Sequence, residues 1–334
     1  MKTKTKIPTG YVSHLSLMET EIAIKTLKDY FERTLAKKLD LLRVSAPLFV
    51  KRESGLNDDL NGVERPVGFD HEDSRVEIVH SLAKWKRMAL GRYGFEVGKG
   101  LYTDMNAIRR DEVLDELHSM YVDQWDWEKV ITKDMRSEAT LKEIVEAIYS
   151  VFKETAAHMS AIYPVLSFDL PEEIYFVSTQ ELEDMYPEMS TKEREDAITE
   201  KLKAVFISKI GHDLVSGKPH DGRAPDYDDW TLNGDIVFWN PVLKQAFELS
   251  SMGIRVDEDA LEKQLELRGA SDRLSMPFHK ALMDGELPYT VGGGIGQSRI
   301  CMFFLQKAHI GEVQASIWDQ ETHSVCQKHG VVLL

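Results

Sequence analysis

The sequence predicts an α+β protein in which helices flank an antiparallel β-sheet. Strand-like segments follow one another across short turns in residues 100–130 and 234–256, which favours antiparallel pairing. Long amphipathic helices are expected over residues 17–39 and 137–162, where apolar residues recur at helical spacing. Because such helices bury only one face, they are expected to pack on the sheet within a single domain that spans residues 1–334.

The first part of the chain is expected to alternate helix, strand and loop. Ser16 and Glu19 have the spacing of a capping box at the start of the first helix. The segment LLRVSAPLFV is strand-like, and its Pro47 favours a sheet edge or an interface. Residues 53–74 are rich in Gly, Asn, Asp and Glu and are expected to form a long loop. Ser81 is expected to cap the short helix SLAKWKRMAL.

Later elements continue the same pattern. Ser190 and Glu193 have capping-box spacing at the start of a helix expected over residues 190–204. The strand AVFISKI follows it, and then a loop rich in Gly, Asp and Pro over residues 211–230. Residues 234–256 are expected to form a β-hairpin. Two short helices come next, and a last helix is entered through VGGGIGQSR.

Composition and charge exclude several classes of protein. The chain has 334 residues, with 41 Lys and Arg against 56 Asp and Glu, a net charge of −15. It therefore lacks the basic character of a general binder of nucleic acid or of anionic membranes. Its longest apolar run, residues 300–305, is far shorter than the ~20 residues of a membrane span, and the N-terminus lacks an apolar signal region. The two cysteines, Cys301 and Cys326, cannot form a disulfide framework, so a cytoplasmic protein is expected.

The predicted hairpin carries a candidate metal site. If its turn is centred between Pro241 and Val242, Asp235 lies opposite Glu248 on the same face. Facing carboxylates repel each other, and a cation between them would remove that cost. Their hard oxygen atoms suit Mg²⁺. The alternative is a different register with two solvated carboxylates.

The segment GGGIGQSR is a candidate anion site. Its glycines allow close approach of the backbone, and Ser298 could cap the helix that follows. A helix start attracts anions, and Arg299 lies beside it. A plain glycine-rich entry to a helix is the alternative.

The segment from IRRDE to QWDWE predicts a polar cleft. Two strands joined by a basic turn bring Arg109 and Arg110 beside a second strand. On that strand Gln124, Asp126 and Glu128 alternate, and so they share one face. The alternative is a sheet surface that faces solvent.

Taken in order, these segments resemble the catalytic core of class II aminoacyl-tRNA synthetases. APLFV is similar to motif 1, the strand–loop–strand around Arg109 to motif 2, and GGGIGQSR to motif 3. QWDWE and ELSSMGIRV are similar to segments of the aspartyl and asparaginyl enzymes. The resemblance is closer still to ammonia-dependent asparagine synthetase of the A type, through HSLAKWKR, GLYTDMNAIRRDE, YVDQWDWE, RAPDYDDW, LNGDI and ELSSMGIRVD. It covers nearly the whole chain.

This resemblance implies an activity and a set of partners. The family makes L-asparagine from L-aspartate, ATP and ammonia through a β-aspartyl-adenylate, and it releases AMP and pyrophosphate. The resemblance therefore implies ATP as a substrate and Mg²⁺ as a cofactor. It also implies a homodimer, since the first helix and the strand around Pro47 resemble the motif that pairs class II cores.

Roles for individual residues also follow from the resemblance. Arg109 would bind the α-phosphate, Arg299 the nucleotide and its terminal phosphate, and Asp228 the ammonium ion. Asp235 and Glu248 match the metal-binding acids. For aspartate, Lys86 and Arg255 would hold the α-carboxylate, Ser81, Gln124 and Ser251 would donate or accept hydrogen bonds, and Asp58 and Asp126 would meet the α-ammonium. The implied nucleotide-binding set is His80, Arg109, Ser119, Val122, Tyr227, Asp228, Ser250 and Arg299.

Three competing functions are disfavoured. A tRNA synthetase would need an anticodon-binding module of about 100 residues, for which the chain has no room, and a less acidic surface. A non-catalytic relative would be expected to lose Arg109, Arg299 or the acidic pair, all of which are present. Glutamine as nitrogen donor would need a cysteine nucleophile after Met1, where this chain has Lys2.

Overall fold

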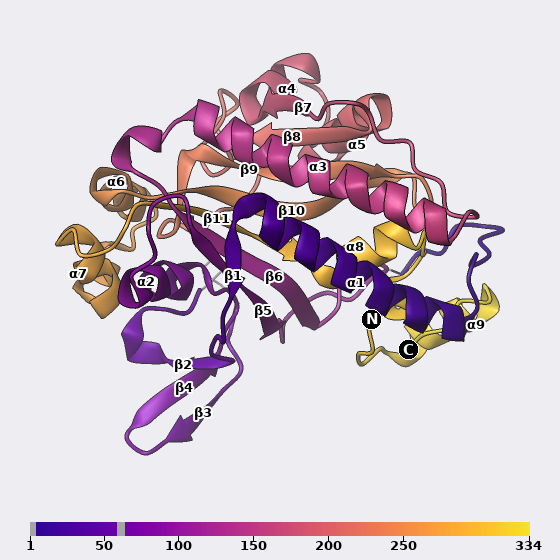
Figure 1. Ribbon diagram of the computed structural model, residues 1–334, viewed down its shortest axis with the longest axis horizontal. Helices are drawn as coiled ribbons and strands as arrows, with labels where there is room; N and C mark the ends of the chain where they lie inside the picture. Colours follow the sequence, from indigo (N-terminus) through magenta and orange to yellow (C-terminus); the bar gives the residue numbers. More distant parts are fainter. Residues whose placement is uncertain (1–4, 59–63) are drawn as a thin grey trace.

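The computed structural model describes residues 5–58 and 64–334, and its largest feature is an eight-stranded β-sheet with helices on both faces (Figure 1). The strand order is β1-β5-β6-β11-β10-β9-β8-β7, and a smaller sheet has the order β2-β4-β3. The strands are β1 (Leu41–Arg43), β2 (Phe49–Lys51), β3 (Gly68–His71), β4 (Ser74–Ile78), β5 (Gly100–Ile108), β6 (Tyr121–Val130), β7 (Tyr175–Ser178), β8 (Ala204–Ser208), β9 (Asp228–Asn240), β10 (Gln245–Arg255) and β11 (Thr290–Gly296).

The large sheet is mixed, so the prediction of an antiparallel sheet is wrong at its two edges. β1 pairs with β5, and β7 with β8, in parallel, whereas the other neighbours are antiparallel. Parallel neighbours need a crossover connection. The smaller sheet and α2 (Ala83–Tyr93) supply it at one edge, and α4 (Thr179–Met185) and α5 (Thr191–Leu202) supply it at the other.

One face of the sheet is covered by α1 (Leu17–Leu39) and α3 (Glu138–Ile162), which run side by side in Figure 1. Aromatic rings join these layers: Phe31 of α1 stacks on Trp125 of β6 at 5.0 Å and meets Phe152 of α3 edge-on at 5.3 Å. The predicted capping boxes of Ser16 and of Ser190 are both confirmed. The core therefore lies between this helical layer and the sheet.

Among the described residues, helices pack on the opposite face at its two ends. Toward β7–β9, Val205 and Val237 pack against Ile198 of α5. Toward β5 and β6, Leu101 packs against Leu90 of α2. Between α5 and α2, the face formed by β6, β11 and β10 carries polar residues and glycines. This polar strip is the floor of the site described below.

The remaining helices lie around these layers, and among the described residues none is long and apolar enough to cross a membrane. The segments after β10 form α6, η3 and α7, those after β11 form α8, η4 and α9, and two short 3₁₀ turns occur earlier in the chain. Their bounds are η1 (Arg52–Ser54), η2 (Lys133–Met135), α6 (Glu258–Leu267), η3 (Ser271–Ser275), α7 (Pro277–Met283), α8 (Gln297–Phe304), η4 (Ile310–Glu312) and α9 (Gln320–Lys328).

Four local predictions were wrong or incomplete. The N-cap of α2 is Leu82 and not Ser81, although Ser81 Oγ accepts from the Ala83 N–H at 3.1 Å. LLRVSAPLFV forms two strands, β1 and β2, which belong to different sheets on either side of Pro47. The range 53–74, expected as a loop, contains all of β3 and the first residue of β4, while its residues 59–63 lie outside the described part. The glycine run 292–294, expected as a helix entry, is the middle of strand β11. By contrast, the hairpin of β9 and β10 is confirmed.

Candidate active site

Two adjoining cavities lie on the polar strip of the sheet. Their volumes are about 1010 and 610 Å³, including space open to solvent, and we call them the larger and the smaller cavity. Arg109, Gln124, Glu248 and Gly294 line both of them. A ligand in one cavity would therefore lie directly beside a ligand in the other.

Buried charges form the floor of the larger cavity. Lys86 Nζ lies 3.1 Å from Asp126 Oδ2 and 3.9 Å from Glu128 Oε2. Arg255 Nη2 donates to Glu128 Oε2 at 2.7 Å, and its Nη1 donates to Asp228. All five side chains are buried. Because each charge has an opposite neighbour, the floor holds these groups in fixed positions.

The same contacts set the protonation of the floor. Burial lowers the pKa of Lys86, and Asp126 and Glu128 oppose that shift. Burial acts to raise the pKa of Glu128, but Arg255 and Lys86 outweigh it, so the pKa is lowered. For Arg255, burial is outweighed by Glu128 and Asp228, and the pKa is raised. The pairing of Glu128 with Arg255 therefore favours the charged forms of both, whereas burial disfavours the charged form of Lys86.

Glycines in β11 make room for these groups. A Cβ at Gly292 would lie 2.0 Å from Glu128 Oε2, and one at Gly294 would lie 2.5 Å from Gln124 Oε1. Both glycines face β6, where they pair with Glu128 and Asp126. Glycine is therefore required at these two positions of β11, because side chains of the neighbouring strand fill the space that a Cβ would occupy.

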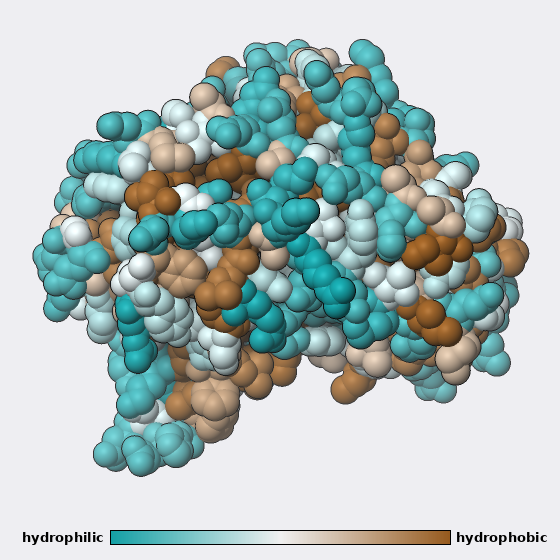
Figure 2. Space-filling model, in the orientation of Figure 1, coloured by the Kyte–Doolittle hydropathy of each residue, from teal (hydrophilic) through white to brown (hydrophobic). Residues whose placement is uncertain are grey.

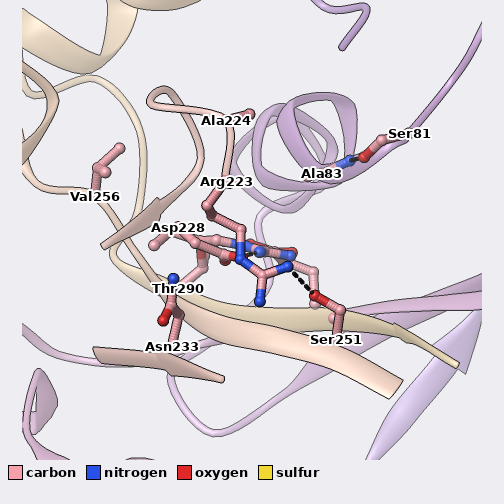
Figure 3. A network of polar contacts seen from close by, with 12 residues as sticks. Ser81, Ala83, Arg223, Ala224, Asp228, Asn233, Ser251, Val256 and Thr290 are labelled. Carbon is pink, nitrogen blue, oxygen red and sulfur yellow. Dashed lines mark hydrogen bonds and ion pairs between the residues drawn. The ribbon is translucent and has the colours of Figure 1, made fainter. Parts of the chain in front are cut away.

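Arg223 enters the larger cavity from the loop between β8 and β9, and it is absent from the residues predicted for the site. Its Nη1 donates to Ser251 Oγ at 2.7 Å, and its Nη2 donates to Asp235 Oδ1 at 2.6 Å. Figure 3 shows Arg223 pointing at Ser251, with Asp228 beside it and the helix that begins after Ser81 across the site. The segment RAPDYDDW contributes to the family resemblance, but no periodicity marks its arginine.

Tyr227 and His80 stand at the wall of the larger cavity. The Arg255 guanidinium lies 5.7 Å from the centre of the Tyr227 ring. Burial, and then the Asp58 and Asp228 carboxylates, raise the pKa of Tyr227 well above its usual value, so its hydroxyl stays protonated. His80 Nδ1 lies 3.0 Å from the carbonyl oxygen of Asp58. The Asp58 carboxylate is therefore close enough to the Tyr227 phenol to affect its pKa.

The smaller cavity is lined by arginines. Arg299 Nη1 donates to the Glu248 carbonyl at 2.9 Å and lies 3.7 Å from its carboxylate. Arg299 Nη2 lies 3.2 Å from His118 Nε2, and His118 Nδ1 lies 2.8 Å from Asp115 Oδ1. An arginine can only donate, so His118 accepts through Nε2 and donates to Asp115 through Nδ1. Arg109 lies beside the shared wall, 3.6 Å from Glu112.

The predicted register of the hairpin is wrong, although its two acids share a face. Asp235 pairs with Ser251 and Val237 pairs with Glu248, because four residues turn the chain and a bulge follows Glu248. Lys244, at φ 55°, closes the turn. The bulge keeps Glu248 and Ser251 on the face of Asp235.

Glu248 is close enough to Asp235 to affect the pKa of that buried carboxyl. Burial raises the pKa of Asp235 to about 7, and Glu248 adds to that rise against the opposing effect of Arg223. Two carboxylates are a donor set that fits Mg²⁺, which takes few protein ligands and completes its shell with phosphates and water. Within residues 5–58 and 64–334, no group of three or more His, Cys, Asp or Glu is arranged to bind a metal ion.

Most predicted site residues come together here. Ser250 and Asp235 are the exceptions, because Ser250 pairs with Ile236 and Ile295 on the core face and Asp235 lies behind Arg223. Ser119 and Val122 line the smaller cavity, as does Arg299. The larger cavity is lined by Asp58, His80, Ser81, Lys86, Arg109, Gln124, Asp126, Tyr227, Asp228, Glu248, Ser251 and Arg255.

The chain is similar to known proteins in its sequence and in its fold. The family model of aspartate-ammonia ligase matches residues 18–330. An aspartate–ammonia ligase of Clostridium tetani is 63% identical over 331 residues, covering 98% of this chain and 97% of that protein. One of Ruminiclostridium cellulolyticum is 65% identical over 330 residues, covering 98% of each.

Solved structures are similar at the level of the fold. An Entamoeba histolytica asparaginyl-tRNA synthetase in complex with asparaginyl-adenylate superposes with a TM-score of 0.62 at 12% identity. The match covers 89% of this chain and 66% of that one. A Pyrococcus horikoshii asparaginyl-tRNA synthetase complexed with asparaginyl-adenylate gives 0.62 at 14% identity, covering 90% and 70%. The fold is therefore that of the class II synthetase core.

Proposed function

The chain belongs to the aspartate–ammonia ligase family, and from that premise we propose that its two cavities hold L-aspartate and ATP side by side. The enzyme makes L-asparagine from L-aspartate and ammonia at the expense of ATP. A β-carboxylate oxygen attacks the α-phosphorus, and the bond to pyrophosphate breaks. Ammonia then attacks the acyl carbon, the bond to AMP breaks, and the nitrogen loses a proton.

The observation that carries this proposal is the mixed charge of the larger cavity beside the arginines of the smaller one. L-aspartate has two carboxylates and one ammonium, so it needs fixed cations and anions close together. Lys86 and Arg255 would hold the α-carboxylate, with Ser81, Gln124 and Ser251 as hydrogen-bonding partners. Asp58 and Asp126 would meet the α-ammonium, which leaves the β-carboxylate free to point at the shared wall.

The smaller cavity would take the nucleotide. Arg109, on the wall that both cavities share, would bind the α-phosphate, and Arg299 would bind the terminal phosphate. These cations offset charge that builds up on the phosphorus and on the leaving pyrophosphate. His80, Ser119, Val122, Tyr227 and Asp228 would contact AMP. Ser250 is left out, because its hydroxyl is buried on the core face of β10.

Asp235 and Glu248 would hold Mg²⁺ together with oxygen atoms of ATP. Glu248 lies 3.7 Å from Arg299, which binds the terminal phosphate in this proposal, and Asp235 shares its face of the hairpin, so the two acids would hold the ion close to the phosphates of ATP. The ion would add positive charge where pyrophosphate leaves.

Asp228 would attract ammonium and accept its proton. Its carboxylate lines the larger cavity, but it also accepts a hydrogen bond from Arg255. The two roles are separable by step. If Asp228 serves ammonia, Asp228→Asn should slow amidation of preformed adenylate more than adenylate formation. Equal losses in both steps would mean that Asp228 serves only as the partner of Arg255.

We also propose a cytoplasmic homodimer whose chain acts as one catalytic domain. Apolar side chains are exposed on and beside the small sheet, where Figure 2 shows brown surface, among them Leu42, Leu48, Phe49 and Phe69. An interface there would bury them. Both cysteines are free and buried, which suits a reducing compartment. Sedimentation velocity that gave a stable monomer at micromolar concentration would contradict the dimer.

The nitrogen donor is tested by comparing ammonium with glutamine. Purified enzyme with aspartate and MgATP should yield asparagine, AMP and pyrophosphate when ammonium chloride is added. Glutamine alone should give no asparagine. This expectation comes from Lys2, which lies outside the described residues. Requirement for a tRNA, or formation of ADP and phosphate, would overturn the proposal.

A further inference from the structure

Arg223 is bonded to the residues that the proposed function gives to substrate and metal. Its guanidinium spans from Ser251 Oγ to Asp235 Oδ1, at 2.7 and 2.6 Å. The side chain is largely buried, and its Nε–H is buried without a hydrogen-bond partner among the described residues. An arginine held this closely occupies the oxygen that a metal would need.

The two acids of the proposed metal site each have an arginine beside them. Asp235 pairs with Arg223, and Glu248 lies near Arg299. Asp228 adds a further negative charge close to Arg223. Three carboxylates therefore gather here, and Arg223 supplies positive charge beside them from inside the protein.

We propose that Arg223 is an internal counter-ion that occupies Asp235 and keeps divalent metal off the acid pair until ATP is bound. This inference rests on the proposed metal role of Asp235 and Glu248. Two carboxylates alone give a metal few ligands, and one of them is already neutralised. ATP brings both missing parts, since its phosphates ligate the metal and offer Arg223 a new anionic partner. Metal and nucleotide therefore bind together.

The test measures metal binding directly, without turnover. Mn²⁺ is titrated into the full-length protein, and free Mn²⁺ is followed by electron paramagnetic resonance in the absence of nucleotide. Arg223→Gln should bind Mn²⁺ at least about tenfold more tightly than the wild type, because the competing cation is gone. Arg223→Lys, which keeps the charge, should remain close to the wild type.

Controls separate this effect from net charge and from misfolding. Arg92→Gln removes an exposed arginine from α2 and should leave Mn²⁺ binding unchanged. Adding Asp235→Asn to Arg223→Gln should abolish the gain. Arg223→Met is a second neutral variant in case Arg223→Gln loses its near-ultraviolet circular dichroism.

Two results would overturn the inference, and only one of them would also contradict the proposed metal role of Asp235. If a folded neutral variant binds Mn²⁺ no more tightly than the wild type, Arg223 does not compete with metal. The metal site itself survives if Asp235→Asn still weakens Mn²⁺ binding in the presence of a non-hydrolysable ATP analogue. If Asp235→Asn has no effect there either, the proposed metal role fails along with the inference.

Discussion

Replacing Gly294 by alanine is expected to weaken the use of aspartate while leaving the fold intact. Gly294 lies in β11 and lines both cavities. An added Cβ would lie 2.5 Å from Gln124 Oε1 and 2.9 Å from Asp126 Oδ1. Both atoms are the far ends of side chains, so they can rotate away without moving the backbone. The two residues proposed to hold aspartate would then be displaced.

The size of the effect follows from those contacts. A hydrogen bond to a charged group contributes about 1.5–3 kcal/mol, and so losing one should raise KM for aspartate about 10- to 150-fold. Gly293→Ala is the matched control, because its Cβ would lie 2.6 Å from Met252 Cβ and from the Ser251 carbonyl oxygen. That clash involves the backbone of β10, and we expect it to lower stability by about 1–3 kcal/mol or more.

The assay combines kinetics with thermal unfolding. Aspartate-dependent release of pyrophosphate gives KM and kcat, and calorimetry gives Tm for each variant. Gly294→Ala should change KM for aspartate far more than KM for ATP, with a Tm near that of the wild type. An unchanged KM, or a fall in Tm as large as that of Gly293→Ala, would refute the role of Gln124 and Asp126.

Other predictions concern buried charge and thiols. Glu128→Gln leaves Arg255 short of a buried counter-charge and should reduce the urea-derived free energy of unfolding by about 3–5 kcal/mol; a loss below about 1 kcal/mol would contradict the network. Asp226 accepts from Lys84, Arg273 and His279, which hold its pKa far below the usual value although burial acts to raise it. Because its folded pKa is depressed, the Asp226 carboxylate stabilises the fold above the unfolded pKa of about 4. The difference in unfolding free energy between the wild type and Asp226→Asn should therefore shrink as the pH falls below that value. A constant difference from pH 7 to 3 would be inconsistent with this role. Burial raises the pKa of Cys301 to about 12 and that of Cys326 to about 11, so neither thiol should react with Ellman's reagent until the protein is denatured.

The sequence predicts the helices and the hairpin well because their signals are local. Capping boxes at Ser16 and Ser190 and apolar periodicity mark where helices begin and which face is buried. The parallel edges of the sheet depend on crossovers between distant segments, and local patterns do not encode those. Strand β11 was missed for a related reason: the groups that crowd its glycines belong to β6 at Gly292 and Gly294 and to β10 at Gly293, both distant in the chain.

Within the site, the residues that escaped prediction depend on backbone detail. The bulge after Glu248 decides which of two adjacent serines faces the cavity, and it selects Ser251 over Ser250. Arg223 lies in a loop without periodicity, so its contact with Asp235 emerges only from the folded structure. Arg109 and the acids of β6 were predicted from the strand–turn–strand pattern around them, and Lys86 from the family resemblance of HSLAKWKR.

The measurement that tests the central claim most directly follows an oxygen atom. Aspartate labelled with ¹⁸O in its β-carboxylate is incubated with enzyme, MgATP and ammonium chloride, and the AMP is analysed by mass spectrometry. If the β-carboxylate is activated by adenylation in these cavities, each AMP formed gains one ¹⁸O atom as asparagine appears. AMP without the label, or label found in inorganic phosphate instead, would contradict the account.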